Sequence, residues 1–288
     1  MLHKFFSIDQ LLVDHVKNNA PDSKVALLLS GGVDSISVGF AAQRLGKKIH
    51  AYSFRLDTHE SYDFLKAKEI SETFDWEFTG VVISTKNIEA DFHHLTRLGC
   101  SKKSSYECSY PFIHVYPKIQ ENYVLSGWAA DGYYGLSKTA MIHYKHTKEK
   151  FDEFRDKYFA PDKCANYIWL KKISDLENKI FITPYLSTEV KDFFYSMDWE
   201  EVNKPFQKHH VRNAFPEFEK IGKVKKHLNL QIDSGVSKLF DTLIQNKNIN
   251  LKNRTRIIDI SRDWNMFWLH FSEIDNPEEY LRRYDYFK

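Results

Sequence analysis

The stretch VALLLSGGVDS, residues 25–35, decides the fold of this chain. Five apolar residues, 25–29, run directly into a pair of glycines, and a short continuous apolar run of this kind is typical of a buried parallel strand. Residues 36–45 then carry apolar side chains at helical spacing. The stretch therefore predicts a strand, a glycine-rich turn and the beginning of a helix.

The turn between this strand and this helix has the composition of an anion-binding loop. Gly31 and Gly32 let backbone N–H groups approach a ligand, and the dipole of the following helix favours negative charge. Ser30 and Ser35 add hydroxyl donors. Asp34 would repel a phosphate unless a divalent cation lay between them. The loop thus predicts a phosphate site with a metal, and the alternative is a plain strand-to-helix turn, for which the same residues are common.

Three further segments have the pattern of strands: 49–56, 79–84 and 123–126. Residues 57–74, between the first two of them, have apolar side chains at helical spacing. This alternation predicts an α/β fold with a doubly wound, mostly parallel sheet. We also expect helices at 5–19 and 88–98, a polar loop at 99–110, and, within 180–194, a turn followed by a helix that Ser187 caps.

The loop after the strand at 123–126 is expected to complete a ligand site. It contains the sequence GWAADG. Ligands of open parallel sheets bind at the carboxyl ends of the strands. Ser126 and Asp131 are therefore expected to face Ser30 and Asp34 across a cleft.

Composition limits the class of protein. The 288 residues are 42% hydrophobic and have a net charge of +2, which allows a sizeable core and gives no overall signature of polyanion binding. No run of about twenty apolar residues predicts a membrane span, and the N-terminus lacks the pattern of a signal peptide. Three cysteines without a C-x-x-C pair favour a reducing, cytoplasmic location and give no zinc signature.

The run S-G-G-x-D-S after an apolar strand resembles the phosphate loop of the PP-loop ATP pyrophosphatases. Members of that superfamily bind ATP, activate a substrate oxygen as an adenylate and release pyrophosphate. The loop is not a Walker A motif, because no Gly-Lys-Ser/Thr follows it.

Later segments resemble one branch of this superfamily, the synthetase domain of asparagine synthetases. The order of the segments agrees with that domain, and the resemblance covers about residues 24–240. The matching segments are LSGWAADGYYG (125–135), TPYLS (183–187), KHHVRNAF (208–215) and KVKKHL (223–228).

The resemblance implies a role for each matching residue, with ATP and Mg²⁺ as cofactors. Asp34 and Asp131 would share the magnesium ion, and Lys225 would be the catalytic cation that stabilises phosphate charge, with Asp34 as its catalytic partner. The predicted pyrophosphate ligands are Ser30, Gly31, Gly32 and Ser35. The predicted neighbours of the nucleotide are Leu29 and Ser53 beside the adenosine, and Ser126 and Gly127 from the opposite strand.

Three residues depart from the asparagine synthetase pattern. Trp128 and Gly132 stand where that branch has glutamates, and Ser187 stands where it has an aspartate. An indole cannot accept a proton at neutral pH, so the departures argue against asparagine as the product. A tryptophan in a cleft suits stacking on a flat or apolar substrate, and Trp128 is assigned to the substrate side. The alternative is a tryptophan packed in the core.

The expected activity is that of an AMP- and pyrophosphate-forming ligase that activates a small carboxylate for attack by an amine. No glutaminase segment is present before the match and no Cys follows Met1, so ammonia would come from solution or a separate ammonia-supplying protein, or another amine would serve. We expect a nucleotide-binding α/β core with an N-terminal helix at 1–136 and a mainly helical substrate-side region at 137–288.

Two other functions are compatible with the sequence. Residues 204–256 carry twelve Lys or Arg against four Asp or Glu, a net charge of +8. This segment would suit a PP-loop enzyme that modifies a nucleic-acid base, although the C-x-x-C pairs common in thiolating members are absent. A non-catalytic ATP- or AMP-binding protein is disfavoured, since Asp34 near phosphates serves little purpose without a metal.

Overall fold

The computed structural model describes residues 7–100, 103–159, 165–222 and 229–246. Its centre is a sheet of five parallel strands in the order β3-β2-β1-β4-β5. The chain proceeds from β1 to β2 and β3 on one side and then returns to β4 on the other. The order therefore reverses between β1 and β4. The strands are β1 (Lys24–Leu28), β2 (Lys48–Leu56), β3 (Glu77–Ile83), β4 (Tyr123–Ser126) and β5 (Ile180–Ile182).

Helices cover both faces of this sheet, which confirms the doubly wound α/β fold. Alternate residues of β1 enter separate cores: Val25 and Leu27 pack on one face, and Ala26 and Leu28 on the other. The helices that supply the first core include α1 (Ile8–Asn19), α2 (Val33–Arg44), α3 (Tyr62–Thr73), α7 (Ala130–Tyr134), α8 (Lys138–His143), α9 (Lys148–Phe159), α11 (Thr188–Tyr195), α12 (Trp199–Asn203) and α13 (His209–Ala214).

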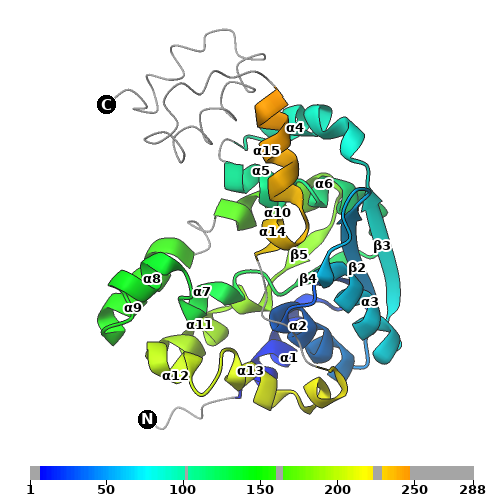
Figure 1. Cartoon of the computed structure of the whole chain (residues 1–288). Coiled ribbons are helices and arrows are strands. Elements are labelled where there is room, and N and C mark those ends of the chain that lie inside the picture. The colour runs from blue at the N-terminus through cyan, green and yellow to red at the C-terminus, as the bar shows by residue number, and fades with distance from the viewer. Residues whose placement is uncertain (1–6, 101–102, 160–164, 223–228, 247–288) are drawn as a thin grey trace.

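The second core is formed with a separate group of helices. The helices of this group are α4 (Ile88–Arg97), α5 (Lys103–Ser109), α6 (Phe112–Val115), α10 (Ala165–Leu176), α14 (Leu230–Asp233) and α15 (Val236–Asn246). Helices α7–α9, α11 and α12 gather at the end of the molecule away from β2 and β3 (Figure 1). Four 3₁₀ turns complete the described elements: Thr85–Asn87, Tyr116–Lys118, Pro184–Leu186 and Pro216–Lys220. Among the described helices, none is long and apolar enough to cross a membrane.

Several predicted boundaries differ from those observed. The helix expected at 57–74 begins at Tyr62, because the Ser61 hydroxyl accepts a hydrogen bond from the Phe64 N–H and caps it. The loop expected at 99–110 is wrong, since it contains α5. That helix is stabilised by tertiary contacts: the Tyr106 ring stacks on Phe92 with centroids 4.5 Å apart, and its hydroxyl donates to the Cys100 carbonyl at 2.6 Å.

The stretch 180–194 contains both a predicted and an unpredicted element. Ser187 caps α11, as expected, by accepting from the Val190 N–H at 3.2 Å. The residues before it form β5, which the sequence analysis did not predict, because three residues are too few to show a periodic pattern. Since β5 pairs with β4, part of the region 137–288 completes the sheet of the predicted core. The division of the chain into a nucleotide-binding core at 1–136 and a substrate-side region at 137–288 stays a prediction.

A buried polar cluster occupies the amino-terminal side of the sheet, away from the loop at 30–35. The Glu121 carboxylate contacts His50 Nδ1 at 2.9 Å, accepts from the Tyr52 hydroxyl at 2.9 Å and pairs with Lys24 Nζ at 3.1 Å. Burial alone would raise the pKa of Glu121, but the hydrogen bonds from these partners lower it to about 2. The ionised carboxylate therefore stabilises the fold.

We expect Glu121→Gln to destabilise the protein in a pH-dependent way. Because the folded pKa lies below the ordinary value of 4.5, the contribution of Glu121 is complete above that pH and is lost as pH falls toward 2. Urea unfolding should show a loss of about 1–3 kcal/mol at pH 7 and a much smaller loss near pH 2.

The matched control is Glu77→Gln. Glu77 pairs with the same Lys24 at 2.7 Å, but its side chain is 54% exposed, so its replacement should change stability less. An equal effect of Glu121→Gln at both pH values would contradict the assigned role.

Candidate active site

A cavity of about 390 Å³ opens at the carboxyl ends of β1, β2 and β4, where the strand order reverses. This is the place where open α/β sheets bind ligands. The structure brings ten of the twelve predicted site residues to its wall. These are Leu29, Ser30, Gly32, Asp34, Ser35, Ser53, Ser126, Gly127, Trp128 and Asp131. Gly31 faces α3 instead, and Lys225 lies outside the described residues.

The loop that joins β1 to α2 is folded tightly on itself. The Ser30 and Ser35 hydroxyls hydrogen-bond each other at 3.0 Å, and the Gly32 N–H donates to Ser30 Oγ at 3.2 Å. Within the described part of the chain, no side chain caps the beginning of α2 at Gly32. Backbone N–H groups of the first turn can therefore bind an anion, as the motif predicts.

Two glycines are required here by close approach. A Cβ atom on Gly127 would lie 2.4 Å from the backbone carbon of Asp34 and from the Ser35 nitrogen. The loop after β4 thus lies directly on the first turn of α2. Gly31 packs against α3, since a Cβ atom on it would lie 2.9 Å from Lys66 Cβ.

Lys208 is a charged member of the site that the sequence analysis missed. Its Nζ lies 2.5 Å from Asp34 Oδ2 and 2.7 Å from Asp131 Oδ1. Burial would lower the pKa of Lys208, but the two carboxylates outweigh burial and raise it above its usual range, so the ammonium stays charged. The available signal was its place as the first residue of the segment 208–215, which resembles a family motif.

The carboxylates of Asp34 and Asp131 are suited to a shared divalent cation. They lie in the first turns of α2 and α7, which follow β1 and β4, and converge on one cationic atom, Lys208 Nζ. Magnesium is usually bound by one or two carboxylates together with substrate phosphates and water. The described residues contain no group of three or more His, Cys, Asp or Glu that would hold a metal by itself. The donor set thus fits a Mg²⁺ ion that is bound together with nucleotide phosphates.

The short helix α7, which carries Asp131, is fixed by side chains from the helical region. Arg155 is fully buried and donates to the Tyr133 carbonyl at 3.1 Å, and the Asn203 amide donates to the Tyr134 carbonyl at 2.9 Å. These donors satisfy carbonyls at the end of a helix of five residues. Burial lowers the pKa of Arg155 to about 10, although Asp152 opposes this effect.

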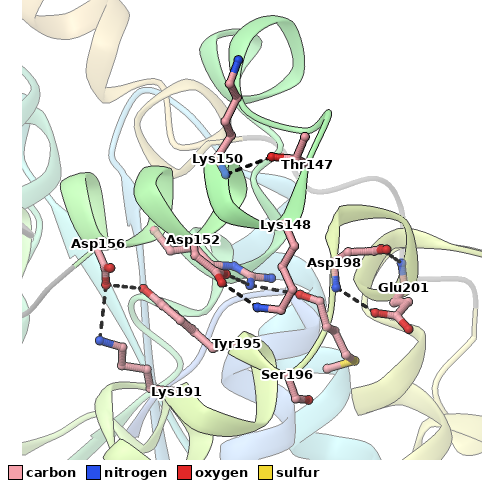
Figure 2. Close-up of polar contacts among 12 residues, drawn as sticks. Thr147, Lys148, Lys150, Asp152, Asp156, Lys191, Tyr195, Ser196, Asp198 and Glu201 are labelled. Carbon is pink, nitrogen blue, oxygen red and sulfur yellow. Dashed lines mark hydrogen bonds and ion pairs between the residues drawn. The ribbon is translucent and has the colours of Figure 1, made fainter.

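Contacts between α9 and α11 support this arrangement (Figure 2). Asp156 of α9 accepts from the Tyr195 hydroxyl at 2.8 Å and from Lys191 at 3.4 Å. Asp152 accepts from Lys148 at 2.5 Å and from Arg155 at 3.0 Å. These helices therefore help to hold α7, and with it Asp131, in position.

Two residues beside the cavity have a left-handed backbone. Ala129 has φ of 72° and precedes α7, and Lys208 has φ of 62° and precedes α13. This conformation costs about 1–2 kcal/mol for a residue with a side chain, and such strain is frequent at functional sites. Asp131 and Lys208, which contact each other, both lie at these positions or within two residues of them.

Apart from the loop at 30–35 and the two aspartates Asp34 and Asp131, much of the cavity wall is aromatic and amide-rich. Among the described residues that line the cavity there is no Lys, Arg or His. The Asn166 Oδ1 atom is buried and has no hydrogen-bond partner within the described chain. These lining residues are Tyr52, Phe54, Phe112, Trp128, Cys108, Asn166, Asn229, Leu230 and Gln231, and Asp63 adds a further carboxylate to the wall. Such a wall can stack on a planar group and exchange hydrogen bonds with it.

Residues 7–177 match the family model described as asparagine synthase. The chain belongs to the asparagine synthase family. The matched residues include β1–β4, Asp34, Asp131 and Trp128, and Lys208 lies beyond them. Membership makes the chain one of the ATP-dependent PP-loop ligases that form amides.

Solved structures show a more distant similarity. NMN synthetase from Francisella tularensis is 16% identical, with a TM-score of 0.34, covering 77% of this chain and 97% of that chain. The NH3-dependent NAD synthetase from Campylobacter jejuni is 13% identical, with a TM-score of 0.30 and coverage of 77% and 96%. A predicted subunit of tRNA methyltransferase from Methanocaldococcus jannaschii is 14% identical, with a TM-score of 0.33 and coverage of 68% and 88%. No curated protein matches the chain.

We expect Gly127→Ala to damage the site directly. The added methyl group would meet backbone atoms at 2.4 Å, so the first turn of α2 or the loop after β4 must shift. Overpacking of this kind costs about 1–3 kcal/mol. ATP affinity, measured by titration calorimetry, should fall at least about tenfold, which corresponds to 1.4 kcal/mol.

The control is Gly222→Ala, since a Cβ atom there would meet no described atom within 4 Å. That variant should bind ATP like the wild type. Unchanged ATP affinity in Gly127→Ala would show that the contact between the two loops does not shape the nucleotide site.

Proposed function

We propose that this protein is a ligase that activates a carboxylate with ATP and then joins it to ammonia or another amine. A carboxylate oxygen attacks the α-phosphorus, and the bond to the bridging oxygen breaks so that pyrophosphate leaves with that oxygen. The amine nitrogen then attacks the carbonyl carbon of the adenylate, loses a proton and displaces AMP. The observation that carries the proposal is the convergence of Asp34 and Asp131 beside the loop at 30–35, in a cavity at the strand-order reversal.

The residues of the chain have separate roles in this proposal. The backbone N–H groups of the loop, with Ser30 and Ser35, hold the leaving pyrophosphate. Asp34 and Asp131 hold Mg²⁺, which when bound neutralises charge on the phosphate oxygens. Leu29 and Ser53 border the adenosine, Ser126 and Gly127 contact the nucleotide from the β4 side, and Lys225, outside the described residues, remains the proposed catalytic cation.

The acceptor in this proposal has a planar, uncharged body that carries the reacting carboxylate. The aromatic and amide wall favours such a molecule, because burying a charged group without a partner is costly. An amino acid such as aspartate would bring an ammonium and a second carboxylate, and the described wall offers no cationic side chain for the latter. Trp128 is proposed to stack on the planar group, and the three cysteines support a cytoplasmic location.

A second candidate is adenylation of a nucleic-acid base. The same wall would accept a base, and the segment 204–256 has a net charge of +8. RNA and small planar carboxylates should therefore be compared in the same assay.

The products should be AMP and pyrophosphate. The loop at 30–35 grips the leaving group, so attack falls on the α-phosphorus. Chromatography of labelled ATP after incubation with pools of carboxylates, amines and RNA should show AMP and pyrophosphate in equal amounts. Asp34→Asn should remove this activity, and stoichiometric ADP from the wild type would contradict the proposed chemistry.

Trp128 should determine affinity for the acceptor and not for ATP. We expect Trp128→Ala to weaken binding of pyridine-3-carboxylate about tenfold, since aromatic pairs contribute about 0.5–1.5 kcal/mol beyond their buried area. The measurement is calorimetry in the presence of α,β-methylene-ATP, with L-aspartate as the charged comparison. ATP-analogue affinity should change less than about threefold, because this proposal assigns Trp128 to the acceptor and not to the nucleotide.

Trp128→Phe should retain most of the affinity. Trp169→Phe is the matched control, since Trp169 packs near the same core but does not line the cavity. If Trp128→Ala weakens nucleotide binding and leaves the acceptor unaffected, Trp128 belongs to the nucleotide side.

A further inference from the structure

Lys208 is a nearly buried lysine whose ammonium contacts two carboxylates from other elements. Its side chain is 10% exposed, and the ammonium contacts one buried carboxylate, Asp34, and one largely exposed carboxylate, Asp131, whose side chain is 60% exposed. Asp34 belongs to α2, Asp131 belongs to α7, and Lys208 directly precedes α13. A side chain from one part of the chain therefore joins the two carboxylates that the nucleotide site needs.

The fold holds Lys208 rigidly. Its backbone is left-handed at the beginning of α13, and Val211 in that helix is fully buried in the core that also contains α2. The ammonium also lies 5.5 Å from the centre of the Tyr134 ring, a favourable place for a cation. These contacts fix the ammonium beside Asp34.

The electrostatic consequence concerns the divalent cation. Two carboxylates alone would present a charge of −2 to a free metal ion, and Lys208 reduces this to −1 while occupying one oxygen of each carboxylate. Nucleotide phosphates bring additional negative charge to the same place. The attraction for a metal ion is therefore weak before the nucleotide arrives and strong when the two arrive together.

We propose that Lys208 is a built-in counter-ion that holds Asp34 and Asp131 together and excludes divalent cations from the site until nucleotide binds. The metal then enters with the nucleotide as one complex. This inference rests on the proposed function only in assigning the two carboxylates to metal binding, and Lys208 is a positioning residue in it.

The experiment measures Mn²⁺ binding as a probe for Mg²⁺, by electron paramagnetic resonance of the full chain. We expect the wild type to bind Mn²⁺ at least tenfold more weakly alone than with α,β-methylene-ATP. Lys208→Met should bind Mn²⁺ alone at least tenfold more tightly than the wild type, and Lys208→Arg should remain like the wild type. Adding Asp131→Asn to Lys208→Met should remove the gained site.

The matched control is Lys204→Met. Lys204 is an exposed lysine four residues away that pairs with Glu200 at 2.9 Å, so its loss removes the same charge without freeing either aspartate. It should not change Mn²⁺ binding. If Lys208→Met binds Mn²⁺ no better than the wild type, the proposal is overturned and Lys208 is an ordinary structural ion pair.

Two further comparisons distinguish the role of Lys208 from a folding defect and from the proposed reaction. Should Lys208→Met fail to fold by circular dichroism, the wild-type comparison decides, because equal Mn²⁺ affinity with and without nucleotide overturns the proposal. The Mn²⁺ measurement needs no turnover. Absence of AMP formation would therefore refute the proposed reaction while leaving the role of Lys208 to be judged by metal binding alone.

Discussion

The contact of Lys208 with Asp34 and Asp131 is the interaction on which the arrangement of this site depends. Asp34 belongs to the first turn after β1, and Asp131 to the first turn after β4. Two carboxylates this close would repel each other. The buried ammonium removes that repulsion, and it also ties α13 to the two loops that border the cavity.

The sheet makes this contact possible. Because β1 and β4 are neighbours in space although 94 residues of chain separate Leu28 from Tyr123, the loops after them approach until Gly127 touches the backbone of Asp34. Only a residue without a side chain fits there. The helical region then fixes the second loop from behind, through Arg155 and Asn203 on the carbonyls of α7. Residues far from the cavity thus determine where Asp131 points.

The cavity has two chemically distinct parts. The part at the 30–35 loop offers N–H groups, hydroxyls and carboxylates, which suit phosphates and a metal. Other lining residues offer aromatic rings and amides, including the Asn166 oxygen, which has no hydrogen-bond partner among the described residues. Under the proposed function, the first set of groups serves the nucleotide and the second, which includes Trp128, serves the acceptor.

The sequence by itself determined the strand, turn and helix at 25–44, the four longer strands and the cap at Ser187. These depend on apolar periodicity and on glycine or serine at a turn, which act over a few residues. The motifs of the sequence also indicated the family. The sequence also identified ten of the residues that line the cavity. Only the tertiary structure decided the helix at Lys103–Ser109, the short strand β5 and the position of Lys208. The first two are stabilised by packing and strand pairing, to which neighbouring residues in sequence contribute little. The third depends on a contact across 174 residues of chain, between charges that no local pattern connects.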